Sequence, residues 1–143
     1  MFRRILNFFW EKNYFLITVL LFIFPCALKG QIVIDTDTIK VNESYDNIAV
    51  KKLSSDKNST TFLILIKKEV KLHKHQAHSE TIYVIEGTGE MRLGEKKWLI
   101  KEGDVLFIPE NTPHSVKVTS DIPLKVLSVQ APEFDGTDRI LLE

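Results

Sequence analysis

Cysteine is almost absent from this sequence, because Cys26 is the only one among 143 residues. One cysteine per chain excludes an internal disulfide, a cysteine-based zinc site and an iron–sulfur cluster. An excess of charge is absent as well, since 19 basic residues balance 19 acidic ones. A neutral chain gives no electrostatic basis for binding nucleic acid. The length suits a single folded domain, for which roughly 100 to 200 residues are usual.

Long apolar runs are confined to the N-terminus. Three basic residues precede a stretch without charge, Asn13 to Leu28. It is slightly longer than the h-region of a signal peptide, about 7 to 15 residues, and shorter than the roughly 18 of a spanning helix. We expect residues 1–30 to form a hydrophobic signal helix that directs export to the periplasm or the medium. A retained membrane anchor and a lipidated Cys26 are the alternatives.

Helical periodicity is missing from residue 31 onward. Short apolar segments alternate with turn residues at regular intervals, which is typical of an antiparallel all-β sandwich or barrel. The polar residues 56–60 favour a loop, and residues 31–44 favour an edge strand or an extended arm. We expect strands at Thr61–Ile66, Glu80–Glu86, Glu90–Leu93, Lys97–Ile100, Val105–Ile108, His114–Val118 and Leu124–Val129.

Histidines cluster in this β region, just before the strand that Glu80 opens. Residues i and i+2 of a strand face the same side, so His73 and His75 can present two imidazoles to one point. His114 begins a separate strand that can return to the same interior. Three neutral imidazoles and one carboxylate suit a divalent transition metal such as Zn, Fe, Mn, Ni or Cu, without selecting among them. We expect one such metal per chain.

Two motifs resemble those of the cupin superfamily. The segment from His73 to Gly87 matches HxH(x)4E(x)6G, the first cupin motif, and the segment from Gly103 to His114 matches G(x)5PxG(x)2H, the second. The second motif departs from the pattern at Asn111, which replaces its middle glycine. Asn is the non-glycine residue that best tolerates a left-handed turn, so we expect the turn to be kept.

The resemblance implies an antiparallel cupin or jelly-roll β-barrel, a double-stranded β-helix, over residues 31–143. It makes His73, His75, Glu80 and His114 the metal ligands. In some cupin enzymes the ligating glutamate also acts as a catalytic base, a role that the resemblance implies for Glu80. Small cupins often pair through edge strands, which implies a homodimer and suggests the arm at residues 31–44 as the pairing element.

His78 has two interpretations. It is either a solvated loop residue or an acid–base group at the rim of the pocket, since imidazole titrates near neutral pH. The aromatic residues Phe62, Trp98 and Phe107 are most simply part of the barrel core.

Cupin resemblance permits several functions. We expect a metal-dependent enzyme, of the dioxygenase, isomerase or lyase type, that acts on a small oxygenated metabolite such as a sugar derivative, a phenol or a keto acid. The alternative is a non-catalytic module that binds or senses a small molecule, for example a sugar, and whose metal is structural. A third possibility is a metal-free scaffold, because fold does not dictate function.

Overall fold

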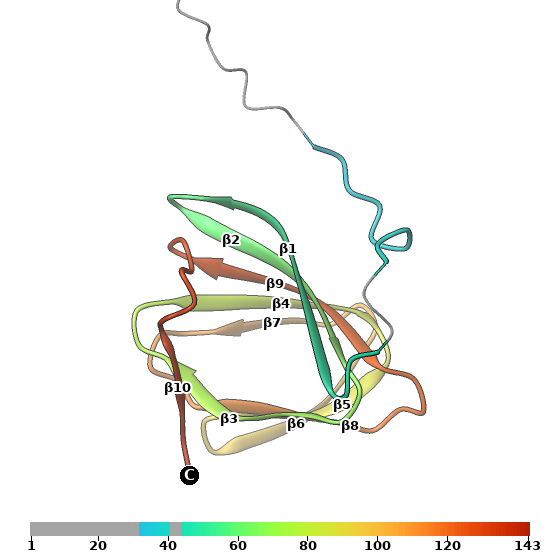
Figure 1. The fold of residues 1–143 in the computed structure, drawn as a ribbon. Helices are drawn as coiled ribbons and strands as arrows, with labels where there is room; N and C mark the ends of the chain where they lie inside the picture. The colour runs from blue at the N-terminus through green and yellow to red at the C-terminus, as the bar shows by residue number, and fades with distance from the viewer. Residues whose placement is uncertain (1–31, 41–43) are drawn as a thin grey trace, which may run out of the picture. The chain divides into compact units, whose positions relative to one another are not determined.

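The computed structural model describes residues 32–40 and 44–143 (Figure 1). Within these ranges the regular structure consists of strands, and no helix is long and apolar enough to cross a membrane. The expected signal or anchor helix of residues 1–30 lies outside the described residues. The strands are β1 (Ile48–Asp56), β2 (Ser59–Ile66), β3 (Glu69–His75), β4 (Ser79–Glu86), β5 (Thr88–Leu93), β6 (Lys96–Lys101), β7 (Val105–Ile108), β8 (His114–Val118), β9 (Leu124–Ala131) and β10 (Arg139–Leu141).

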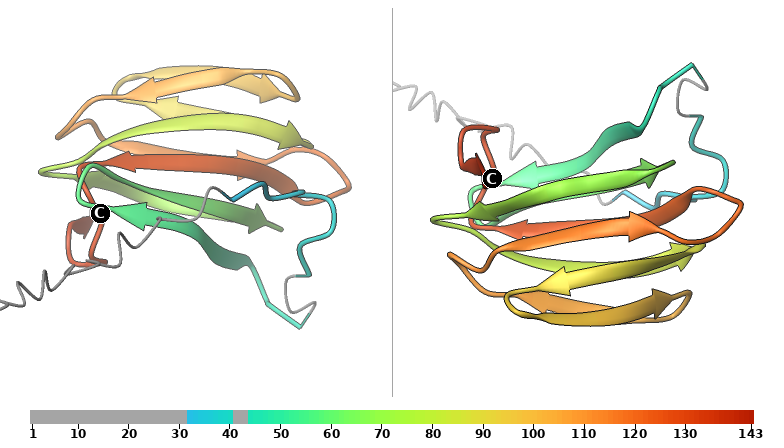
Figure 2. Two further views of the ribbon diagram at one scale, coloured as in Figure 1. Left: turned by 90° about the horizontal axis from the view of Figure 1, so that it is seen from above. Right: turned by 90° about the horizontal axis from the view of Figure 1, so that it is seen from below.

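The strands form two five-stranded sheets that face each other (Figure 1). The first has the order β1-β2-β9-β4-β7 and the second the order β10-β3-β8-β5-β6, with antiparallel pairing throughout. Neighbours in a sheet are often distant in sequence, as β2 and β9 are, and Figure 2 shows the two layers from opposite sides. This crossing of the chain is the jelly-roll arrangement expected from the sequence.

Because side chains alternate along a strand, every second side chain points into the space between the two sheets. In β9 the buried side chains are Leu124, Val126, Ser128 and Gln130, and the residues between them are partly exposed. The interior therefore changes along this strand from apolar at its start to polar at its end. The apolar part belongs to a core cluster of Ile66, Val84, Met91, Ile100, Ile108, Val116, Leu124 and Val126.

The loop between β7 and β8 is hydrogen-bonded to the end of β3, the other strand that carries histidines. Asn111 has a φ of 58°, the left-handed conformation expected where the motif usually has glycine. Its backbone N–H donates to the carbonyl of His75 at 2.6 Å, and its side-chain amide donates to the carbonyl of Gln76 at 3.1 Å. The loop thus binds the end of β3 and helps to fix where β8 begins.

Seven strands agree with the sequence-based expectation to within two residues, and three were missed: β1, β3 and β10. The loop expected at residues 56–60 is a shorter turn, because β1 ends at Asp56 and β2 begins at Ser59. The first edge strand along the chain is β1, and the described part of the expected arm, residues 32–40 and 44, contains no strand. The lysines and serines of β1 interrupt the alternation of apolar and polar residues, so the sequence did not identify this strand.

Two aromatic residues assigned to the core lie at the surface. Phe107 is 61% exposed, since it alternates with the buried Ile108 and so faces outward from β7. Trp98 is 45% exposed, since it lies on the edge strand β6. Phe62 is half-buried and packs edge-on against Phe134, with ring centroids 6.1 Å apart.

Leu124→Ala tests the position of the core. Leu124 is 1% exposed, so we expect the metal-free protein to lose about 2–5 kcal/mol of unfolding free energy in a denaturant titration. Leu99→Ala is the matched control, because Leu99 is 72% exposed and its loss is expected to cost at most about 0.5 kcal/mol. Equal effects of the two changes would contradict the assigned core.

Candidate metal centre

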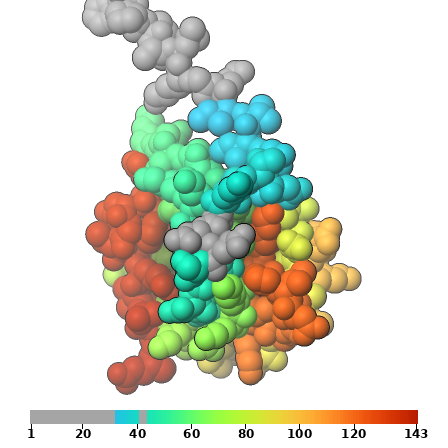
Figure 3. Space-filling model, turned by 45° about the vertical axis from the view of Figure 1, so that its right-hand side comes forward, coloured from blue at the N-terminus to red at the C-terminus, as the bar shows by residue number. Residues whose placement is uncertain are grey.

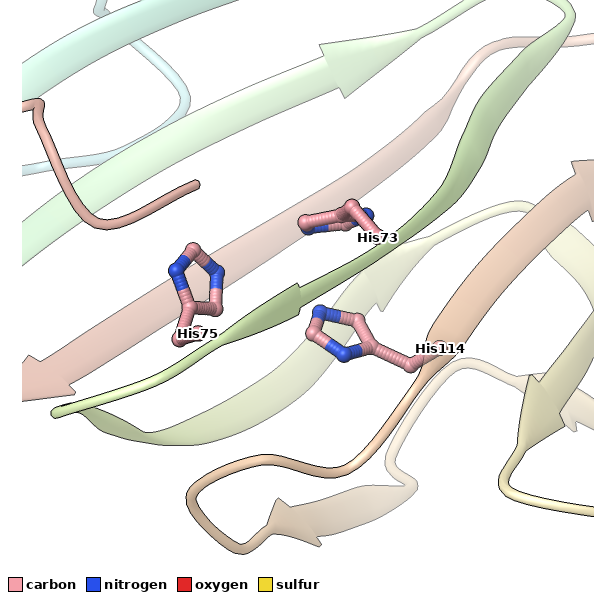
Figure 4. Close-up of side chains that lie close together, drawn as sticks. All are labelled: His73, His75 and His114. Atoms are coloured by element: carbon pink, nitrogen blue, oxygen red, sulfur yellow. The ribbon is translucent and has the colours of Figure 1, made fainter. Parts of the chain in front are cut away.

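Three buried histidines meet at the polar end of the interior. His73 and His75 come from β3 and His114 from the start of β8, and their rings turn toward one another (Figure 4). Each is 5% exposed or less. The ligand atoms of the three rings lie within 4.8 Å of one another, which is close enough to hold one metal ion. Direct pairing of His73 with His114 across β3 and β8 explains why the second motif supplies its ligand here.

A hydrogen bond to a backbone carbonyl fixes the orientation of each ring. Since a carbonyl oxygen only accepts, the Nδ1 atom of each ring must carry the proton, and Nε2 keeps its lone pair. The three bonds are His73 to Lys71 at 2.9 Å, His75 to Asp138 at 3.0 Å and His114 to Thr112 at 2.9 Å. All three imidazoles are thus prepared as neutral Nε2 donors to a cation.

Glu80 reaches the same point from the opposite sheet. Its Oε2 lies 3.3 Å from Nε2 of His114 and 3.8 Å from Nε2 of His75. Its Oε1 accepts hydrogen bonds from the Ser128 hydroxyl at 2.5 Å and from the Gln130 amide at 3.5 Å. One carboxylate oxygen is therefore anchored by β9, and the other faces the histidines.

The electrostatics of the site favour neutral imidazoles and a charged carboxylate. Burial lowers the pKa of His73 to about 4, and the neighbouring His114 adds to this effect. Burial alone would raise the pKa of Glu80, and the Ser128 hydroxyl acts against burial by donating to the charged carboxylate. Burial thus favours the uncharged form of His73 and His75, whose pKa values it lowers, and the Ser128 hydroxyl favours the charged form of Glu80.

The residues fit a metal ion because the ligand atoms of three rings converge and one of them is a buried acceptor without a donor. Nε2 of His114 makes no hydrogen bond of acceptable geometry, although Glu80 is close. A buried nitrogen lone pair without a donor is costly, and a cation would satisfy it together with the lone pairs of the two other rings. His73, His75 and His114 can hold it, and Glu80 is placed to add an oxygen ligand.

A cavity of about 290 Å³ opens beside the histidines. The side chains of His73, His75, Glu80 and His114 form part of its wall, and the remainder is mostly Ile, Val, Leu, Met and Phe. This volume is at the lower end of the range for small-molecule sites, about 300–1,000 Å³. A small organic molecule in the cavity would lie against the imidazoles.

Comparison with known proteins agrees with the two motifs. The family model of the cupin domain matches residues 62–130. An uncharacterized protein of Aquifex aeolicus is 36% identical over 100 residues, which are 70% of this chain and 82% of that protein. The chain belongs to the cupin family. This cupin is also 39% identical over 72 residues, half of its own length, to an uncharacterized protein of Methanocaldococcus jannaschii, and the match spans 58% of that relative.

Other similarities concern parts of proteins or the fold alone. Mannose-1-phosphate guanylyltransferase RfbM of Salmonella typhimurium is 31% identical over 93 residues, 62% of this cupin but 19% of the enzyme. A Klebsiella pneumoniae protein with a double-stranded β-helix domain has a TM-score of 0.68 at 21% identity and covers 80% of this chain and 99% of its own. Pac13, a nucleoside dehydratase, has a TM-score of 0.62 at 16% identity, covering 80% and 92%.

His78 is neither a solvated loop residue nor part of the cavity wall. It is 7% exposed, its Nδ1 binds the carboxylate of Asp138 at 2.5 Å, and its Nε2 donates to the carbonyl of Glu133 at 3.0 Å. Both ring nitrogens are therefore engaged with the C-terminal segment, residues 132–138. In Figure 3 the C-terminal part of the chain, in red, borders green atoms of the earlier strands. Phe134 belongs to it and packs on His75 and His78, with ring centroids 5.5 and 5.3 Å away.

Sequence reasoning missed the residues that support the site from a distance. Ser128 and Gln130 hold Glu80, Phe134 covers two histidines, and Arg139 lies at the cavity beside His75. The alternation in β9 is the one signal that could have indicated Ser128 and Gln130, as polar residues at inward positions of a strand.

His75→Ala tests the metal centre. We expect it to lower zinc affinity by about 100-fold or more, because loss of a ligand exceeds the 10–100-fold cost of losing a supporting contact. A competition titration with a chromogenic chelator measures this. Lys74→Ala is the control, since Lys74 lies between the two histidines but reaches Asn111 with its amine. The same zinc affinity in wild type and His75→Ala would rule out the centre.

His78→Gln tests the tie to the C-terminal segment through pH. Burial lowers the pKa of His78, but the hydrogen bonds to Asp138 and Glu133 outweigh it and raise that pKa. A raised histidine pKa gives stability that is complete below the unfolded value, roughly 6.5, and is lost as pH rises through the folded value. In denaturant titrations of metal-free protein, wild type should exceed His78→Gln more at about pH 6 than at about pH 9. A gap that widens with pH would contradict the ionic tie.

Proposed function

We propose that this cupin binds one divalent transition metal through His73, His75, His114 and Glu80 and acts as an enzyme on a small oxygenated metabolite. The observation that carries the proposal is the set of three Nε2 atoms, each freed by an Nδ1 hydrogen bond, that converge on the wall of a cavity. Four protein ligands leave up to two positions of an octahedron for an exogenous molecule.

The metal would supply Lewis acidity toward a carbonyl or enolate oxygen or, if it is iron or copper, chemistry with dioxygen. In the protein itself, burial favours the neutral form of His73 and His75, the Ser128 hydroxyl donates to the charged form of Glu80, and most of the cavity wall is apolar. Oε1 of Glu80 accepts from Ser128 and Gln130 while Oε2 faces the histidines, an arrangement that favours a ligand role for Glu80 over its role as base.

A non-catalytic binding or sensing module is the second candidate, and one observation favours it. His78 is engaged at both ring nitrogens and does not line the cavity, and Glu80 is held by Ser128 and Gln130 with its other oxygen facing the histidines, so neither of the two expected acid–base residues is placed to exchange a proton with a ligand. The enzyme proposal therefore depends on an open metal position rather than on a protein base.

We also propose export of this cupin to the periplasm or the medium, on the basis of the uncharged stretch at residues 13–28. Its action as a homodimer stays a prediction from the cupin resemblance.

The open coordination position is tested with cobalt. We expect azide to change the visible d–d spectrum of the cobalt-loaded protein, because azide enters a free position on the ion. Glu80→Gln should bind cobalt more weakly, since it removes the single negative charge among the ligands. If neither azide nor nitric oxide changes the spectrum of the cobalt-loaded protein, the result would favour the binding module with a structural metal.

A further inference from the structure

The cavity is polar at one end only. Inward positions of β9 run from Leu124 and Val126 to Ser128 and Gln130, and the neighbouring strand β4 has its polar residue at the same end. In β4 the polar Glu80 precedes Ile82, and both line the cavity. A polyhydroxylated molecule that filled this space would leave many of its hydroxyls without partners against the apolar wall. The wall suits a molecule with an apolar body and a single polar head.

Arg139 supplies a positive charge at the polar end. It pairs directly with His75 across β10 and β3, and residues opposite each other in an antiparallel pair project to the same face about 4.5–5.5 Å apart. Arg139 lines the cavity, is exposed at its rim and makes no ion pair with any carboxylate of residues 32–40 and 44–143. The adjacent Asp138 is not available to it, because that carboxylate accepts bonds from Gln76, Ala77 and His78.

Gln130 adds an acceptor that lacks a donor. Its Oε1 is buried without a hydrogen bond, while its Nε2 points to the carboxylate of Glu80. The opposite amide orientation would place oxygen against that carboxylate, so Oε1 is the atom left over. A hydroxyl or enol group beside the polar head of a ligand would satisfy it.

We infer that the ligand of this cavity is a small carboxylic acid with an apolar body and a 2-hydroxy or enolisable 2-oxo group, whose carboxylate meets the guanidinium of Arg139 and whose hydroxyl or enol donates to Oε1 of Gln130. The inference rests on the proposed metal centre and narrows its substrate class. A divalent ion, three neutral imidazoles, one carboxylate and one guanidinium leave the site with excess positive charge, which an anion neutralises. Arginine binds a carboxylate through two parallel N–H bonds, a geometry that lysine does not offer.

Three probes separate the parts of this ligand. Phenylpyruvate has the apolar body, the 2-oxo group and the carboxylate; phenylacetone replaces the carboxylate by methyl; gluconate keeps a 2-hydroxy acid on a polar body. Calorimetric titration of the zinc-loaded full chain should show phenylpyruvate binding at least about tenfold more tightly than either of the others. Arg139→Met should abolish the advantage over phenylacetone and leave phenylacetone binding unchanged.

Two variants and one measurement keep the outcome unambiguous. Arg139→Lys should retain part of the advantage, and Arg92→Met should retain all of it, since Arg92 donates to Gly94 away from the cavity. Phenylpyruvate binding that survives Arg139→Met, or gluconate binding as tight as that of phenylpyruvate, overturns the inference. So does a zinc-loaded wild type that binds no phenylpyruvate. Zinc content, measured separately, identifies failure of the metal centre itself.

Discussion

Three hydrogen bonds from imidazole Nδ1 atoms to backbone carbonyls are the constraint on which the site depends. Each bond sets the tautomer of one histidine and turns its Nε2 toward the other two rings. The carbonyls belong to β3, to the loop before β8 and to the residue before β10, so the backbone of three distant segments holds the rings. Without these bonds the same residues could rotate, and no fixed set of lone pairs would face the cavity.

The sandwich makes this cluster possible by separating polar from apolar interior positions. Apolar residues at one end of the strands form a core, and polar residues at the other end contact one another, Ser128 and Glu80 within one sheet and Glu80 and His114 between the two. The cost of burying Glu80 is offset by donors from Ser128 and Gln130 on β9. The C-terminal segment closes this end through His78 and Phe134, so the residues that follow the barrel strands are part of the site rather than a tail.

The sequence predicted the parts of the molecule that are set locally. Motif spacing identified the four central side chains, and the positive φ at Asn111 follows from a property of asparagine itself. Residues that depend on register across distant strands could not be placed: Arg139 faces the cavity only because it pairs with His75, more than sixty residues earlier. The exposure of Phe107 likewise follows from its outward position on β7, and the burial of His78 from contacts with a segment more than fifty residues later in the chain.

The central claim is that three imidazoles and one carboxylate share a single cation inside the sandwich. X-ray absorption spectroscopy of the zinc-loaded protein tests it most directly, because the outer scattering shells count histidine ligands. The account predicts three imidazoles with Zn–N distances of about 2.0–2.1 Å and at least one oxygen at about 2.0–2.2 Å. A zinc environment with fewer than three imidazoles, or one made of oxygen ligands alone, would contradict it.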